Sequence, residues 1–110
     1  MNKLWIAMIA AAGLAVAGNA FSAGDAAKGK EKAAACGTCH GPDGNTPIMP
    51  EYPRLAGQAD DYLEKTLRDY KSGKRKNPLM APMAQNLSKQ DMKDLAAYFS
   101  GLKGDLKVKY

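Results

Sequence analysis

Hydrophobic side chains recur at helical spacing in two parts of the chain. Leu63, Leu67 and Tyr70 lie three or four positions apart within DDYLEKTLRDYKSG. A second set follows residue 88 and comprises Met92, Leu95, Ala96 and Phe99. Apolar residues at this spacing form one stripe along an α-helix, with polar residues on the opposite face. The pattern therefore predicts two amphipathic helices.

Residues that favour helix ends bound both segments. Asp60 is a candidate N-cap for the first helix, and Gly73 stands where helices commonly end. Ser88 and Asp91 form the S-x-x-D arrangement of a capping box, in which each side chain accepts from the other residue's backbone N–H. Gly101 closes the second helix.

A third helix is predicted at DAAKGKEKAAAC, where helix-favouring residues follow the candidate N-cap Asp25. It should run from about Ala26 to Ala35 and deliver the cysteines at its end. Gly29 is the exception, because glycine costs about 1 kcal/mol relative to alanine inside a helix. We expect Gly29 to let another element approach closely.

The remaining segments lack a regular period. Seven glycines and prolines interrupt residues 41–57, which we expect to form an irregular loop. A loop of this length is unusual unless it wraps around something, and a flat apolar cofactor would serve. Residues 74–78 form a basic loop, and residues 79–87 contain a proline, so we predict a second loop there. With no convincing strand, the predicted fold class is all-α.

The start of the chain differs from the rest. Lys3 precedes an uncharged run from Leu4 to Gly18, and small residues before Ala23 fit a signal-peptidase site. We predict an export signal over residues 1–22, a single domain over residues 23–110, a periplasmic location and no membrane span in the mature form. The alternatives are cleavage a few residues away or a retained anchor, since this segment is nearly long enough to span a bilayer.

Composition narrows the function classes. The 110 residues carry a formal net charge of +5, which suggests a partner with an acidic surface. Nucleic-acid binding is not indicated, because no long basic run is interleaved with aromatic residues. A domain this small gains from a cofactor that enlarges its core.

The strongest chemical signal is Cys36-Gly-Thr-Cys39-His40. Two thiols three positions apart can each add to one vinyl group of a haem, and the adjacent histidine can then ligate the iron. A thioredoxin-like redox pair would need a βαβ context, and a closed zinc site would need four ligands. A structural disulfide would leave the histidine unexplained. The pattern therefore predicts one covalently bound haem c.

The iron also needs a second axial ligand or an open site. His40 is the sole histidine, so a bis-histidine haem within this chain is excluded. Four methionines follow residue 23. Met92 belongs to the apolar face of the last helix, and Met49 lies in the loop just after His40. Met80 and Met83 remain as candidates, and the residues alone do not separate them.

The segments CGTCHGPDG, YPRLAGQ and MAPMAQNLSKQDMKDLAAYF resemble class I bacterial cytochromes c, especially cytochrome c4-like and related one-haem periplasmic carriers. The resemblance covers nearly the whole predicted mature chain. It implies a class I cytochrome c fold, with about three main helices and long loops around one haem. Cytochromes c4 carry two haem domains, whereas this chain has a single CxxCH.

The resemblance also implies roles for particular residues. The axial methionine of the family lies eight residues before the serine that caps the last helix, which selects Met80. A loop proline accepts a hydrogen bond from the axial histidine, and Pro47 matches that position, with Pro42 and Pro50 as rivals. The first and last helices cross through a small residue and an aromatic, for which Gly29 and Tyr98 or Phe99 fit.

These features predict a periplasmic single-electron carrier rather than an enzyme. Its partners would be redox proteins, and we expect a monomer. Basic residues shortly before Met80 are either a solvated face or a surface that steers acidic partners; they are Lys71, Lys74, Arg75 and Lys76. The alternatives are a haem subunit of a larger oxidoreductase, or a peroxidase-like or gas-binding protein with a labile sixth ligand.

Overall fold

The computed structural model describes residues 23–106, and this part of the chain contains five helices and no strand. They are α1 (Ala26–Lys32), α2 (Ala34–His40), α3 (Asp60–Ser72), α4 (Met80–Gln85) and α5 (Lys89–Ser100). The predicted export signal lies outside the described residues. Within them, no helix is long and apolar enough to cross a membrane. The all-α prediction is confirmed.

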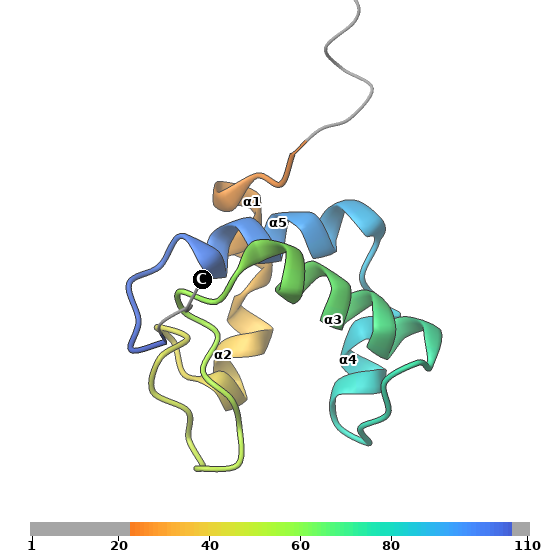
Figure 1. The fold of residues 1–110 in the computed structure, drawn as a ribbon, viewed down its shortest axis with the longest axis horizontal. Coiled ribbons are helices and arrows are strands. Elements are labelled where there is room, and N and C mark those ends of the chain that lie inside the picture. Colours follow the sequence, from red (N-terminus) through yellow and green to blue (C-terminus); the bar gives the residue numbers. More distant parts are fainter. Residues whose placement is uncertain (1–22, 107–110) are drawn as a thin grey trace, which may run out of the picture.

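Helix α5 is the centre of the arrangement. Helix α1 crosses it, α3 packs along it, and α3 in turn packs against α4 (Figure 1). The apolar face predicted for α5 is buried and meets Leu63 of α3 and Ala33 at the junction of α1 and α2. Figure 1 shows α2 and α4 apart from each other, on two sides of the molecule below α5.

The first helix extends further than the sequence predicted. Its end was expected near Ala35, but helical backbone continues through α2 to His40, with a break at Ala33. The N–H of Ala33 is shared between the carbonyls of Gly29 and Lys30, which tightens that turn without ending the helix. The cysteines therefore lie within a helix.

Gly29 is the crossing point of α1 and α5, as its helix-disfavouring character predicted. A Cβ at this position would lie 2.0 Å from the Asp94 carbonyl oxygen and 2.8 Å from Cβ of Tyr98. Backbone therefore touches backbone, and no side chain fits between the helices. The aromatic at the crossing is Tyr98, not Phe99.

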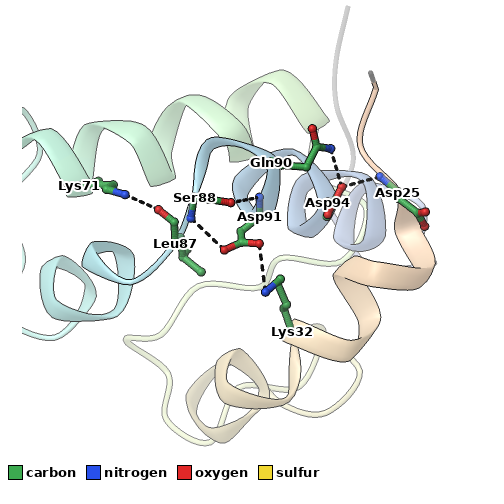
Figure 2. Close-up of polar contacts among 8 residues, drawn as sticks. All are labelled: Asp25, Lys32, Lys71, Leu87, Ser88, Gln90, Asp91 and Asp94. Atoms are coloured by element: carbon green, nitrogen blue, oxygen red, sulfur yellow. Dashed lines mark hydrogen bonds and ion pairs between the residues drawn. The ribbon is translucent and has the colours of Figure 1, made fainter. Parts of the chain in front are cut away.

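A buried carboxylate ties the start of α1 to α5. Asp94 is 2% exposed, and its Oδ1 accepts from the main-chain N–H of Asp25 at 2.8 Å and from Nε2 of Gln90 at 2.9 Å (Figure 2). Asp25 itself caps α1 by accepting from Ala27 and Lys28, as predicted. These bonds satisfy a group that would be costly to bury unpaired.

The start of α5 is held by the predicted capping box. Ser88 Oγ accepts from the N–H of Asp91 at 3.0 Å, and the Asp91 carboxylate accepts from the N–H of Ser88 at 2.9 Å. Asp91 also pairs with Lys32 of α1 at 3.0 Å, while Lys71 of α3 donates to the carbonyl of Leu87 (Figure 2). One helix start thereby joins three segments of the chain.

The prediction of a loop over residues 79–87 is wrong, because α4 occupies most of that segment. Pro82 is the third residue of that helix. N–H groups in the first turn have no acceptor within their own helix, so a proline there removes no helical hydrogen bond. The side chain of Asn77 accepts from the N–H groups of Leu79 and Met80 and starts the turn.

Helix α3 has its predicted extent, except that it begins one residue earlier, so that Asp60 lies inside the helix. Ala59 occupies the cap position, and Asp60 is the first helical residue, where its charge still favours the helix dipole. Gly73 ends the helix in the left-handed conformation, with φ of 87°. Glycine adopts this conformation without strain, so its predicted role as the helix end is confirmed.

Replacement of Gly29 by alanine should destabilise the protein. Alanine favours helix by about 1 kcal/mol, but its Cβ would overlap the Asp94 carbonyl, and overpacking of this kind costs about 1–3 kcal/mol or more. We expect a net loss of about 2 kcal/mol in the free energy of unfolding, measured by urea titration. Gly101→Ala is the control, since its Cβ would meet no atom closer than 3.4 Å. Equal stability of Gly29→Ala and wild type would contradict the close crossing.

Asp91→Asn should destabilise the protein in a pH-dependent way. The hydrogen bond from the Ser88 N–H, and then the nearby Lys32, lower the pKa of Asp91 below its ordinary value of 3.8. A lowered folded-state pKa contributes stability above the ordinary value, and this contribution is lost as pH falls through the folded-state pKa. We expect the free energy of unfolding of Asp91→Asn to be about 1 kcal/mol below that of the wild type at pH 7. This difference should disappear near pH 2. A deficit of the same size at both pH values, from urea unfolding, would rule out this role.

Candidate haem site

Cys36, Cys39 and His40 occupy one face of α2, at positions i, i+3 and i+4. Side chains at this spacing lie one above another on a helix surface. Both cysteines are half-buried and free, so the alternative of a disulfide between them is not formed. The helix thus presents two thiols and one imidazole to the same side.

The environment of these thiols argues against a redox dithiol or a zinc site. Burial raises the pKa of the Cys36 thiol above its ordinary value of 9.0, whereas reactive dithiols depend on a lowered pKa. No strand is present in the described residues to form a βαβ unit. Across the same residues, no three His, Cys, Asp or Glu side chains come close enough together to hold one metal ion, and this includes Cys36, Cys39 and His40. What remains is thiols suited to covalent attachment beside a histidine.

His40 is buried and oriented by one hydrogen bond. Its Nδ1 lies 2.7 Å from the carbonyl oxygen of Pro53. A carbonyl oxygen only accepts, so Nδ1 carries the proton and donates it. The neutral imidazole then keeps its lone pair on Nε2, which is the form that binds a metal. His40 therefore offers one nitrogen of fixed direction.

The prediction that Pro47 accepts this hydrogen bond is wrong, and so are the rivals Pro42 and Pro50. The chain after α2 turns back on the helix end, where the N–H of Ile48 donates to the carbonyl of Cys39 at 3.1 Å. This return brings residue 47 to the helix backbone. The segment that passes the imidazole comes later, at Pro53.

Two glycines make this return possible. Gly41 has φ of 91°, and a Cβ there would lie 2.2 Å from the Thr46 carbonyl oxygen. Gly44 has φ of 67°, and its Cβ would lie 3.0 Å from the ring of Phe99 in the core. Residues 41–57 form the predicted irregular loop, which is bonded to α2 through the N–H of Ile48 and to α5 through the N–H of Gly57.

The four methionines after residue 23 have distinct positions. Met92 is 2% exposed and part of the core, as predicted. Met49 lies in the loop after His40 and is 43% exposed. Met80 is half-buried as the first residue of α4, and Met83, one turn later, is 44% exposed. A ligand from α4 would come from a different side of the molecule than α2 (Figure 1).

Large exposed hydrophobic side chains cluster in sequence around these candidate ligands. They are Ile48 and Met49 after His40, Leu79 and Met83 around Met80, and Tyr62 on α3. Each of these side chains leaves apolar surface open to contact by an apolar group. Together with the thiols and imidazole of α2, they fit a large flat apolar group held by a nitrogen and two sulfur atoms.

The basic residues before Met80 differ in the contacts that they make. Lys71 bonds the Leu87 carbonyl, and the Arg75 guanidinium lies 5.1 Å from the centre of the Tyr70 ring. Arg75 also donates to the Tyr62 hydroxyl at 3.4 Å and lowers the pKa of that phenol below its ordinary value. Lys74 and Lys76 are exposed.

Pro53 and its neighbour Tyr52 are site residues that the sequence analysis missed. The ring of Tyr52 lies 6.5 Å from that of His40, centre to centre. Both belong to YPRLAGQ, one of the three segments that carried the resemblance. That segment was the available signal, but its proline was not considered as the acceptor.

Comparison with known proteins gives consistent matches. The family model for cytochrome c matches residues 26–103. Cytochrome c4 of Pseudomonas aeruginosa is 50% identical over 103 residues, covering 94% of this chain and 50% of that protein. Cytochrome c-554(548) of Halomonas halodenitrificans is 49% identical over 81 residues, covering 71% of this chain and 96% of that protein.

Solved structures agree with the sequence matches. Reduced recombinant cytochrome c4 from Pseudomonas stutzeri superposes with a TM-score of 0.71 at 47% identity, covering 76% of this chain and 48% of that chain. The chain thus spans about half the length of the cytochromes c4 it matches, while it spans nearly all of the shorter Halomonas protein.

Proposed function

Because this chain belongs to the cytochrome c family, whose members carry covalently bound haem c, we propose that it is a periplasmic carrier of single electrons with one haem. The observation that carries the proposal is the face of α2 with two thiols and an oriented imidazole. When bound, the haem supplies one-electron chemistry between Fe(III) and Fe(II). The class I cytochrome c fold, which is all-α in the described part, positions these side chains.

In this proposal the residues of α2 hold the haem from one side. Cys36 and Cys39 form the thioether bonds, and His40 ligates the iron through Nε2. The carbonyl of Pro53 keeps the His40 proton on Nδ1 and fixes the ring direction. Burial of His40 excludes water from the ligand bond.

We assign the opposite ligand to Met80. Its half-buried position as the first residue of α4 supports this assignment, and Figure 1 shows α4 apart from α2. In this assignment Met83 packs against the haem beside Met80. With His40 and Met80 both holding the haem iron, no place would be left there for a substrate, and the protein would transfer electrons without other chemistry. A thioether ligand also favours the reduced state.

The proposal includes the compartment and the partner surface. Residues 1–22 act as the export signal, and residues 23–110 form the mature domain. Donor and acceptor are redox proteins with acidic docking surfaces, which the exposed Lys74 and Lys76 attract. These lysines lie a few residues before Met80, so a partner bound there would lie near the proposed haem.

The exported protein itself tests the function. We expect its intact mass to show one added haem and the loss of the first 22 residues. Its reduced form should be low-spin and should not bind carbon monoxide, because Met80 fills the sixth position. Rapid carbon monoxide binding by the wild type would instead favour the gas-binding or peroxidase-like alternative. Purification only as part of a larger complex would favour a subunit role.

Met80→Ala and Met83→Ala form a matched pair for this experiment. Both remove one methionine from α4, but only Met80→Ala should open the iron to carbon monoxide. The opposite result, with binding in Met83→Ala alone, would move the ligand to Met83.

Charge should steer redox partners to the Met80 side. We expect the reduced double variant Lys74→Gln/Lys76→Gln to be oxidised by the anion ferricyanide severalfold more slowly than the reduced wild type at low salt. The two rates should become equal near 0.5 M salt, because charges are then screened within about 5 Å. Lys28→Gln/Lys30→Gln on α1 removes the same charge elsewhere and should have a smaller effect. The docking proposal fails if the two double variants behave alike, or if the wild-type rate ignores ionic strength.

A further inference from the structure

The acceptor of the His40 hydrogen bond belongs to a loop without regular structure, so something else must hold it. Pro53 has no N–H and cannot anchor itself through a main-chain donor. Its carbonyl lies in the rigid peptide plane that joins it to Arg54. The position of that oxygen therefore depends on what fixes Arg54 and the residues after it.

Arg54 is fixed through its side chain. Its Nε donates to the carbonyl oxygen of Asn45 at 2.9 Å, across nine residues of the loop. Directly beyond Arg54, the N–H groups of Leu55 and Ala56 both donate to the carbonyl of Gly44, at 2.7 and 3.0 Å. The segment that follows Pro53 is thus bound to the turn at residues 44–45 by three hydrogen bonds.

That turn is itself rigid. Oδ1 of Asp43 accepts from the N–H groups of Asn45 and Thr46, both at 2.9 Å. Oδ2 accepts from the Thr46 hydroxyl at 3.0 Å. The N–H donors lower the pKa of Asp43 below its ordinary value, so the carboxylate is ionised and accepts these bonds at neutral pH.

The segment after α5 clamps the turn from outside. The N–H of Asp105 donates to Oδ1 of Asn45 at 2.9 Å, and Nδ2 of Asn45 donates back to the Asp105 carboxylate at 3.3 Å. Gly104 lies against Ala56, where a Cβ would come within 2.3 Å of the Ala56 carbonyl oxygen. Residues 101–106 run beside the loop in Figure 1.

We infer that Arg54 is a positioning residue for His40. Its Nε–H, bound to the clamped turn at Asn45, sets the peptide plane that carries the Pro53 oxygen and so the strength of the bond from His40 Nδ1. The inference rests on the proposed function, in which His40 ligates the iron. A stronger bond makes the imidazole more basic and stabilises Fe(III), so loss of the Arg54 bond should favour Fe(II).

Two variants separate the hydrogen bond from the charge. In glutamine, Nε2 is the same number of bonds from the backbone as Nε of arginine, so Arg54→Gln keeps a donor and loses the charge. Arg54→Met loses both. Loss of a positive charge alone would disfavour Fe(II), which is opposite in sign to loss of the bond. The difference between the two variants therefore reports the donor.

The test measures the reduction potential and the solvent exchange of the His40 Nδ1 proton by NMR, both on the haem-loaded protein. We expect the equilibrium constant for reduction to be roughly three to ten times higher in Arg54→Met than in Arg54→Gln, where tenfold equals about 59 mV for one electron. The ring proton should exchange roughly tenfold faster in Arg54→Met alone. Arg68→Met, an exposed arginine on α3, is the control and should not change the exchange.

Equal potentials and equal exchange in the Met and Gln variants would overturn the inference. If Arg54→Met does not fold, Asn45→Ala decides, because it removes both side-chain bonds of the clamp and keeps the main-chain carbonyl that accepts from Arg54. Faster exchange then supports the inference, and unchanged exchange overturns it. A wild-type protein without haem would contradict the proposed function instead. The two failures are therefore distinguishable.

Discussion

The crossing of α1 and α5 is the contact on which the remaining structure depends. At Gly29 the two backbones touch, so the angle and depth of the crossing leave no room for adjustment. Because α2 continues from α1, this contact also sets where the two thiols and the imidazole lie. Bonds at both ends of the contact, through Asp94 and through Asp91, keep α1 from sliding along α5.

The core built by these helices is small. In the described part, the buried hydrophobic residues are Ala33, Ala56, Leu63, Tyr70, Ala84, Met92, Leu95, Ala96 and Phe99, of which five form one contact cluster. Large apolar side chains near the candidate ligands in the sequence, such as Ile48, Leu79 and Met83, stay exposed. A haem seated there would join these side chains to the core. In that arrangement the cofactor contributes to folding as well as to chemistry.

Local chemistry made much of this structure predictable. The stripe and capping box of α5, the cap at Asp25 and the close approach at Gly29 each follow from spacing or propensity, and each is confirmed. Helix α4 was missed because a proline breaks a helix only beyond its first turn, and the position of that turn is not visible locally. Pro53 was missed because a carbonyl acceptor carries no side-chain signature.

The clamp on the loop has a consequence for the speed of electron transfer. An electron moves fastest between sites whose atoms barely shift when the charge changes. The His40 ring is held by a main-chain oxygen, and that oxygen belongs to a segment bound at Gly44 and Asn45. An imidazole held in this way, if bound to the iron as proposed, would have little freedom to relax in either oxidation state. The dense hydrogen bonding of an apparently irregular loop would thus keep the reorganisation energy of the site low.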